Sequence, residues 1–335
     1  MGEKPGHRVV VSTMKNEGPF ILEWVAHQKA LGFDEIVVCT NDCEDTTVGI
    51  LKRLEQMGIV HHHETRVGRG GIHRSALRQA FRKDVVRSAD WIFVCDVDEF
   101  LNIHVGDGSV DALIEQSPDA DVIAVPWRVF GPANVTLYRD RLVTRQFRLA
   151  EAAPDVRPEA GKFVKSLFRG PERFKRMGLH TPIPADEHAK DIRMVYPGGT
   201  PFITGGERSP HRPSFEVAQV NHYALRSLDS FLVKRARGRA NHMHHVLGRD
   251  YWDRFDLNDV RDDSIARYDA AVERWLAEFK ADPRLARLHQ RAVRWHNWKA
   301  RMQRRDPEVR PVWLQIREEM VARGQALEVA PKAAA

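Results

Sequence analysis

The feature that most constrains the fold of this chain is a short apolar stretch followed by three acidic residues. Residues 91–95 (Trp-Ile-Phe-Val-Cys) have the length and composition of a strand that is buried on both faces of a parallel sheet. Side chains alternate along a strand, so we expect Asp96 and Asp98 on one face, with Val97 turned back into the protein. The stretch therefore predicts two adjacent carboxylates at the end of a buried strand.

Such a pair of carboxylates is a candidate metal site. The two negative charges raise each other's pKa, and a divalent cation relieves that repulsion. Oxygen ligands suit Mg²⁺ or Mn²⁺, and open α/β sheets bind their ligands at the carboxyl ends of their strands. A polar turn whose acids face water is the simpler interpretation, and the neighbouring segments decide between the two.

Strands and helices alternate through the first hundred residues. Strand-like runs at residues 9–11, 36–39, 59–63 and 91–95 are separated by helical patterns, the last of which spans about 72–86. This alternation predicts an α/β fold with a parallel central sheet whose polar loops open on one edge. The loop residues expected to converge there with Asp96 and Asp98 are Thr13, Asn16, Glu17, Asp42, Asp45 and the loop 66–71.

The rest of the chain is less regular and then helical. A helical pattern at 110–116 and a strand-like run at 122–129 come first. Short strand-like runs follow at 144–149, 162–168, 194–196 and 217–222. Helical patterns at 262–279, 283–301 and 308–323 precede a tail at 329–335 that we expect to be unstructured.

Composition and charge limit the functional classes. The net charge of +6 suits a phosphate-bearing substrate, a nucleic acid or an anionic membrane surface. No nucleic-acid-binding signature is present, and a solvated helix face best explains the arginines of the last third. No run approaches the roughly 18 apolar residues of a membrane span, and the polar start indicates no signal peptide. Three cysteines are too few for a disulfide framework, so we expect a cytoplasmic protein.

Further residues are candidates for the same site. Arg66 and Arg74 would reach a diphosphate if the helix beginning near residue 72 points its N-terminus inward. His222 follows a strand-like run, and a neutral imidazole there would complete the coordination of a metal, with His180 as the competing candidate. A reaction also needs a base, and the acids available in the middle region are Asp186, Glu187, Asp191 and Glu207, of which Glu207 is preferred.

Together these motifs resemble a glycosyltransferase of the GT-A fold. The chain looks like the branch of family 2, related to family 92, that carries an Asp-x-Asp-Glu-Phe motif. The matching positions are residues 12–17, 22–25, 32–34, 41–42, 96–101 and 221–223, with Ser227, Phe231, Lys234 and Gly238. The resemblance implies a Rossmann-like, mostly parallel sheet in a domain over 1–240, with a nucleotide-sugar half at about 8–130 and an acceptor half at about 131–240. It does not explain the helical extension over 241–328.

The resemblance also implies an activity and roles for named residues. It implies a metal-dependent, inverting enzyme of bacterial type that moves a sugar from a nucleotide diphosphate sugar to a hydroxyl of a glycan or a lipid-linked acceptor. Asp96 would lie near the ribose, Asp98 and His222 would meet Mn²⁺ or Mg²⁺, and Lys234 would meet the phosphates. The base and ribose pocket would be lined by Thr13, Asn16, Glu17 and Asp42.

One departure from the family 2 pattern concerns the catalytic base. Many family 2 enzymes carry a Glu-Asp pair that supplies this base, and residues 169–222 hold no clear counterpart. The basic helices after residue 241 suggest, in addition, a peripheral contact with the inner face of a membrane.

Two other functional classes remain open. A sugar nucleotidyltransferase also uses a parallel sheet, a metal and paired acids, but normally has a glycine-rich loop with Lys or Arg directly after its first strand. Here that loop reads Ser-Thr-Met-Lys-Asn-Glu, over residues 12–17. A non-catalytic module that binds nucleotides or glycans is the third class.

Overall fold

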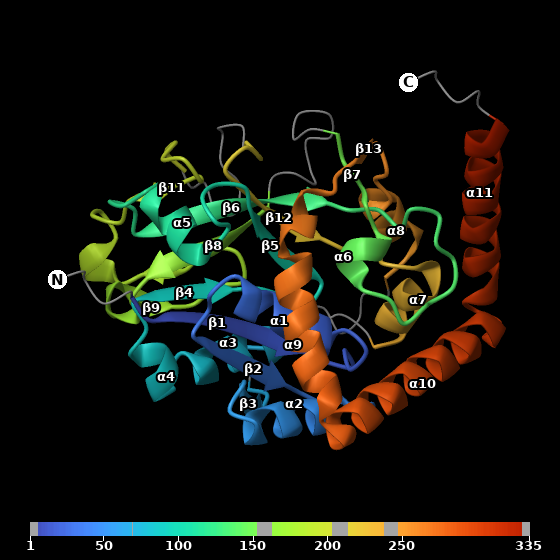
Figure 1. Cartoon of the computed structure of the whole chain (residues 1–335), viewed down its shortest axis with the longest axis horizontal. Helices are drawn as coiled ribbons and strands as arrows, with labels where there is room; N and C mark the ends of the chain where they lie inside the picture. Colours follow the sequence, from blue (N-terminus) through green and yellow to red (C-terminus); the bar gives the residue numbers. More distant parts are fainter. Residues whose placement is uncertain (1–5, 69, 153–162, 203–213, 238–246, 330–335) are drawn as a thin grey trace.

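The computed structural model describes residues 6–68, 70–152, 163–202, 214–237 and 247–329, and its first part alternates strands and helices (Figure 1). The elements are β1 (Arg8–Met14), α1 (Ile21–Ala30), β2 (Glu35–Thr40), α2 (Thr47–Gln56), β3 (His61–Glu64), α3 (Ile72–Ala80), α4 (Asp84–Arg87) and β4 (Trp91–Val94). The four predicted strands are confirmed, with small shifts at their ends. The helix predicted over 72–86 is instead two helices, because the backbone of Lys83 is extended, with ψ at 141°.

The strands form one mixed sheet in the order β3-β2-β1-β4-β8-β6-β12-β5. β1 pairs in parallel with β2 and β4, and β2 pairs in parallel with β3. β8 (Val164–Arg169) runs antiparallel between β4 and β6 (Val122–Val129). β12 (Ala218–His222) is parallel to β6 and antiparallel to β5 (Glu99–Ile103). The predicted α/β fold with a mostly parallel central sheet flanked by helices is therefore confirmed.

The remaining elements of the middle region are short. They are α5 (Val110–Glu115), α6 (Val143–Gln146), β7 (Leu149–Ala150), β9 (Phe174–Arg176), β10 (Ile183–Pro184), β11 (Met194–Val195), α7 (Leu228–Ala236), α8 (Arg249–Phe255) and β13 (Val260–Arg261), with 3-10 turns at Pro171–Arg173, Asp186–His188 and Ser264–Tyr268. β5 was not predicted as a strand, since its residues were read as part of the acidic motif.

The strand predicted over 144–149 is wrong, because this segment begins with α6. Glu23 of α1 accepts hydrogen bonds from the backbone N–H groups of Val143 and Thr144, at 2.7 and 3.0 Å. The first N–H groups of a helix have no partner within the helix, so a carboxylate placed there stabilises the helical turn. Glu23 lies 120 residues earlier in the chain than Val143, and a local sequence pattern does not reveal such a cap.

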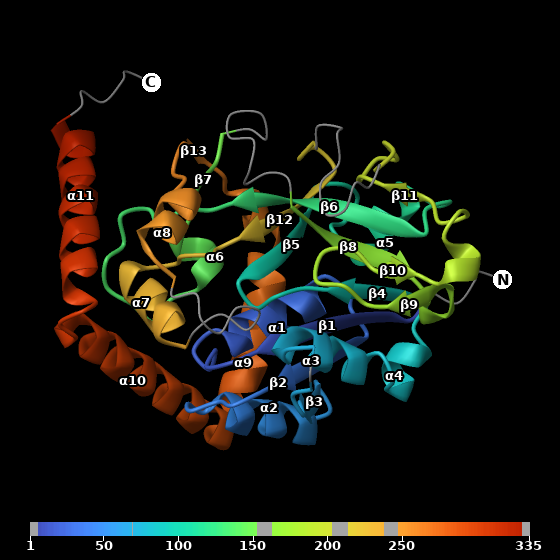
Figure 2. The ribbon, with the colours of Figure 1, turned by 180° about the vertical axis from the view of Figure 1, so that it is seen from behind.

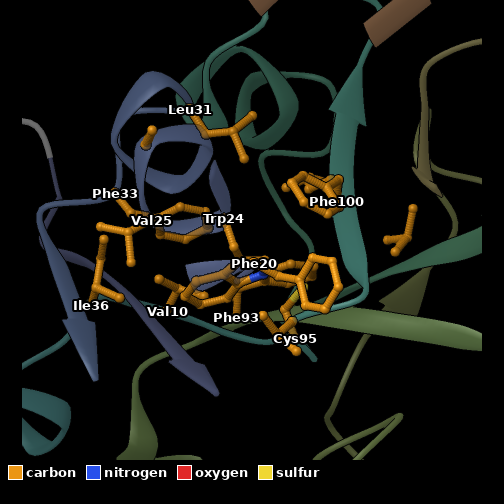
Figure 3. Packing of buried hydrophobic residues seen from close by; sticks show 14 of the residues in the cluster. Val10, Phe20, Trp24, Val25, Leu31, Phe33, Ile36, Phe93, Cys95 and Phe100 are labelled. Atoms are coloured by element: carbon orange, nitrogen blue, oxygen red, sulfur yellow. The ribbon is translucent and has the colours of Figure 1, made fainter. Parts of the chain in front are cut away.

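Helix α1 fixes the backbone of the acidic motif. Trp24 of α1 is fully buried in the core, beside Phe93 and Phe100 (Figure 3). Its indole N–H donates to the carbonyl oxygens of Asp96 and Glu99, at 3.1 and 3.2 Å. Removing a buried tryptophan side chain typically costs roughly 3–5 kcal/mol. Core packing and the position of the motif therefore depend on the same side chain.

The C-terminal extension is mainly helical, as predicted, and ends with α9 (Asp269–Ala281), α10 (Pro283–Arg305) and α11 (Arg310–Val329) (Figure 2). α9 packs against α1, and α10 packs against α2 and α7. Asp282 accepts the N–H of Leu285 at the start of α10 and pairs with Arg53 of α2.

The boundary between the two predicted domains near residue 240 stays a prediction. Of the tail predicted over 329–335, Val329 is the last residue of α11, and 330–335 lie outside the described residues. In the described parts of the chain, no helix combines the length and the apolar character that crossing a membrane requires.

Candidate functional site

A cavity of about 540 Å³ lies at the carboxyl edge of the sheet. Thr13 at the end of β1, Asn41 after β2 and His222 at the end of β12 line it, together with both aspartates of the acidic motif. α3, α7 and α8 contribute further side chains to its walls. The polar ends of several strands therefore meet in one cavity, as the alternation of strands and helices predicts.

The aspartates reach this cavity by a turn rather than by strand alternation. β4 ends at Val94. β5 begins at Glu99 and runs in the opposite direction to β4 within the sheet. Asp96, Val97 and Asp98 form the reversal between them, with Val97 buried. The expectation that strand alternation places Asp96 and Asp98 on one face is therefore wrong, although both side chains line the cavity.

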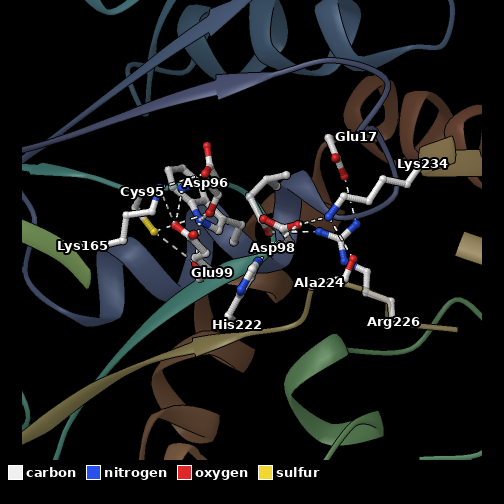
Figure 4. A network of polar contacts seen from close by, with 12 residues as sticks. Glu17, Cys95, Asp96, Asp98, Glu99, Lys165, His222, Ala224, Arg226 and Lys234 are labelled. Carbon is white, nitrogen blue, oxygen red and sulfur yellow. Dashed lines mark hydrogen bonds and ion pairs between the residues drawn. The ribbon is translucent and has the colours of Figure 1, made fainter. Parts of the chain in front are cut away.

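A buried and a half-buried ammonium group meet the acids of this turn (Figure 4). The Lys165 Nζ lies 2.8 Å from an Asp96 carboxylate oxygen and 3.1 Å from a Glu99 oxygen, and its side chain is 1% exposed. The Lys234 Nζ lies 2.6 Å from an Asp98 oxygen. Each aspartate of the turn therefore has an ammonium group as its partner, Lys165 for Asp96 and Lys234 for Asp98.

The contacts set the ionisation of the three acids. Burial alone would raise the pKa of Asp98, but the positive charges of Lys234 and Arg226 hold it well below its usual range. Lys165 likewise lowers the pKa of Asp96 against the effect of burial. Burial raises the pKa of Glu99 to about 8, and Lys165 opposes this only in part. Two charged aspartates and a less acidic glutamate therefore share the turn.

Asp98, Glu99 and His222 are the described residues best placed to hold a metal ion. One ligand atom from each lies within 4.8 Å of the others. The Glu99 Oε1 and the His222 Nδ1 are buried and have no hydrogen-bond partner among the described residues. Burial lowers the pKa of His222 to about 3, so the ring is neutral and able to coordinate. Two carboxylates and an imidazole fit Mn²⁺ or Mg²⁺.

This group differs from the predicted set of Asp96, Asp98 and His222. Asp96 pairs with Lys165 and is not part of the group, and Glu99 takes its place. His180, the competing candidate, also lines the cavity, but its Nδ1 contacts the carbonyl oxygen of Val164 at 3.0 Å.

The predicted residues of the first loop have different environments. Thr13 and Glu17 line the cavity. Glu17 pairs with Arg226 at 2.9 Å and also with Arg237. Asn16 does not line it, since its backbone has a positive φ of 54° and its side chain accepts the N–H of Glu44. Asn16 therefore joins two loops rather than facing the cavity.

The other predicted residues lie around or outside the cavity. Asp42 is exposed, and its neighbour Asn41 lines the cavity instead. Arg66 is exposed and does not line it, and Arg74 lines an adjoining groove. Lys234 lines the cavity. Glu207, the preferred base, lies outside the described residues.

Sequence reasoning missed a group of aromatic residues on the cavity wall. The Trp127 ring lies 4.1 Å from the His222 ring and 5.2 Å from Phe163, and Tyr251 and Phe255 line the same cavity. The Trp127 indole N–H is buried without a hydrogen-bond partner among the described residues. An aromatic face with an available donor suits a sugar ring.

Comparisons with known proteins identify a family. The model described as glycosyltransferase family 92 matches residues 7–223. A protein of Ricinus communis named as a family 92 glycosyltransferase is 26% identical over 171 residues, which are 48% of this chain and 30% of that protein. A protein of Oryza sativa that is also named as a family 92 glycosyltransferase is 26% identical over 172 residues, which are 47% of this chain and 28% of that protein. The chain thus matches less than a third of the length of these relatives, which are plant proteins although a bacterial type was expected.

Solved structures resemble this chain only with low sequence identity and low TM-scores. A structure of Staphylococcus aureus TarS 1–349 with UDP is 13% identical, covers 89% of this chain and 91% of that one, and gives a TM-score of 0.35. The mannosyltransferase PcManGT of Pyrobaculum calidifontis, in complex with GDP-Man and Mn²⁺, is 16% identical. The match covers 98% of this chain and 89% of that one, with a TM-score of 0.36. The family assignment therefore depends on the family model.

Proposed function

Because the chain belongs to glycosyltransferase family 92, we propose that it transfers a sugar from a nucleotide diphosphate sugar to a hydroxyl of a glycan or lipid-linked acceptor, with inversion at the anomeric carbon. The observation that carries this proposal is the convergence of three kinds of group in one cavity. Carboxylates and an imidazole lie beside the cations Lys234 and Arg237 and beside an aromatic wall. A metal, a diphosphate and a sugar each have a matching surface there.

Asp98, Glu99 and His222 are proposed to hold Mn²⁺ or Mg²⁺. Such an ion, when bound, neutralises the negative charge that grows on the departing diphosphate. The resemblance to the Asp-x-Asp-Glu-Phe branch of family 2 supports a metal at Asp98. The buried atoms of Glu99 and His222 that find no hydrogen-bond partner among the described residues support their part in it.

The cations and the first loop are proposed to bind the nucleotide. Lys234 and Arg237 lie on and directly after α7 and present two positive charges for the phosphates. Thr13 and Glu17 are proposed to line the base and ribose pocket, with Asp96 near the ribose. Trp127 is proposed to pack on a sugar ring and to donate its indole N–H to a sugar hydroxyl.

Transfer requires one proton acceptor. As the acceptor hydroxyl oxygen bonds to the anomeric carbon, a base takes its proton, and the bond from that carbon to the diphosphate oxygen breaks with its electron pair leaving on the diphosphate. Attack from the side opposite the leaving group inverts the anomeric centre. Glu207 stays the predicted base.

A panel of nucleotide sugars tests the proposal. We expect one donor, such as UDP-GlcNAc or GDP-Man, to stabilise the protein by about 2.7 kcal/mol at a concentration of 100 Kd when Mn²⁺ is present. Differential scanning fluorimetry measures this, and slow release of the free nucleotide diphosphate measures hydrolysis or transfer. Pyrophosphate release from a nucleoside triphosphate would instead indicate a nucleotidyltransferase, and binding without any turnover would indicate a binding module.

We also propose that α10 makes a peripheral contact with an anionic membrane. The helix contains no acidic residue, and its solvent-facing cations are Arg284, Arg287, Arg291, Arg294, Arg301 and Arg305. Trp298 and Met302, which lie between them, are 53% and 46% exposed. A basic helix face with exposed apolar side chains suits the boundary between headgroups and acyl chains.

Vesicle binding tests this contact. We expect the protein to co-sediment with phosphatidylcholine vesicles that contain phosphatidylserine and not with phosphatidylcholine alone. The double variant Arg287→Glu/Arg294→Glu should weaken this binding at least about tenfold, because each surface cation contributes on the order of 1 kcal/mol. Equal binding to both kinds of vesicle, or no effect of the double variant, would contradict the proposal.

A further inference from the structure

A groove of about 890 Å³ adjoins the central cavity. The two share the lining residues His73, Leu179 and His180. One wall of the groove is α3, and the facing wall is the segment 176–194, which contains β10. A smaller cavity of about 350 Å³ extends the groove along α3. The three spaces therefore follow one another from the acidic turn outward.

Arginine side chains line the groove and its extension. Arg74, Arg78 and Arg82 recur every four residues along α3 and just beyond it, and Arg176 at the end of β9 lines the same space. No carboxylate is present among the described residues that line the groove or its extension. Guanidinium groups bind carboxylates and phosphates through paired hydrogen bonds.

Neighbouring cations have carboxylate partners, whereas these four have none in the part of the chain that the structure describes. Lys175 pairs with Asp186 at 3.1 Å, and Arg193 pairs with Asp119 at 3.2 Å. Within the described residues, the four groove arginines have no carboxylate partner. Since basic side chains on a protein surface commonly lie near acidic ones, a row of four without such a partner points to an anionic ligand.

Much of the groove's lining is apolar. Its described lining includes Leu77, Met177, Leu179, Ile192, Met194 and Phe202. Apolar surface suits the C–H faces of sugar rings, and the arginines suit charged substituents on those rings. A long path with both kinds of surface fits a linear chain better than a single small anion.

We propose that the acceptor is a linear glycan bearing carboxylate or phosphate groups, which binds along this groove with its reactive hydroxyl in the central cavity. This inference rests on the proposed function, since it names the acceptor of that same reaction. Arg74, Arg78, Arg82 and Arg176 pair with the anionic groups of the glycan, and the apolar lining packs on its rings.

Calorimetry with the full chain and UDP tests the proposal. The probes are hexagalacturonate, a phosphorylated pentamannose and neutral maltohexaose. At least one charged probe is expected to bind about tenfold more tightly than the neutral one, with a Kd that rises with salt. The preference between the two charged probes identifies carboxylate or phosphate as the recognised group. Arg78→Glu/Arg176→Glu is expected to weaken that binding at least about tenfold, because it replaces two partners by like charges.

The matched control makes the same charge change on α10. Arg287→Glu/Arg294→Glu is expected to leave glycan binding within about twofold, because these residues lie away from the groove. Arg78→Glu/Arg176→Glu should keep the wild-type affinity for UDP. A wild-type chain that does not bind UDP or any other nucleotide of the donor panel would refute the proposed function and not the groove.

Four results would overturn the assignment of the groove. The first is neutral maltohexaose binding as tightly as the charged probes, and the second is an equal loss of glycan binding in both double variants. The third is a parallel loss of UDP affinity in Arg78→Glu/Arg176→Glu, which would place these arginines in the donor site. The fourth is equally tight binding of a short single-stranded DNA that the same variant abolishes.

Discussion

Replacing Asp98 by asparagine is expected to lower kcat/KM for sugar transfer by about 10³-fold, because charge aimed at the reacting groups is the largest contribution such a site makes. The Asp98 carboxylate lies 2.6 Å from the Lys234 ammonium and 3.9 Å from the His222 ring. An amide of the same shape keeps the packing but removes the negative charge. The variant therefore loses the charge that would hold a divalent cation and that orients Lys234.

Initial rates and calorimetry measure this effect together. In the wild type we expect Mn²⁺ to tighten UDP binding, and in the Asp98→Asn variant we expect UDP to bind equally with and without Mn²⁺. Asp84→Asn is a matched control, since Asp84 is an exposed residue of α4 that does not line the cavity. An Asp98→Asn enzyme that keeps its rate and its response to Mn²⁺ would remove Asp98 from the site.

Replacing Lys165 by methionine is expected to reduce the free energy of unfolding by about 3–5 kcal/mol, because it leaves the buried Glu99 and the half-buried Asp96 without their partner. Lys165 is almost completely buried and contacts both Asp96 and Glu99. Burial already raises the pKa of Glu99 to about 8 with Lys165 present, so this carboxyl largely keeps its proton at neutral pH. Asp96 is then the main charge left without a partner, which favours the lower end of the range.

Urea unfolding monitored by tryptophan fluorescence measures the loss. The double variant Lys165→Met/Glu99→Gln should recover part of it, because it removes one of the two carboxylates. Lys175→Met provides the control, since Lys175 lies on the neighbouring β9 with its side chain 60% exposed, and its surface ion pair is worth at most about 1 kcal/mol. Equal losses in Lys165→Met and Lys175→Met would contradict a structural role for the buried ammonium.

Local patterns predicted the regular part of the fold. The strands around Val10, Val37 and Phe93 are short apolar runs between helices with polar ends, and each of them lies in the sheet. The parallel order and the shared cavity edge follow from that alternation. The acidic motif could be recognised as a candidate site in the same way, because its acids directly follow the apolar strand at residues 91–95.

The parts that could not be predicted depend on contacts between distant residues. Glu23 caps α6 from α1, and Lys165 reaches Asp96 from β8, which lies beside β4 although 69 residues separate the two residues. The reversal at Asp96–Asp98 arises because the chain returns as β5 to pair with β12. A lysine in the apolar run of β8 was the one available signal for a buried ion pair.

Anomalous diffraction from a crystal that contains a nucleotide diphosphate sugar and Mn²⁺ tests the central claim most directly. The account predicts a manganese peak between Asp98, Glu99 and His222, with the diphosphate against Lys234 and Arg237. Donor density in another cavity, or donor in this cavity with no peak beside Asp98, would contradict it.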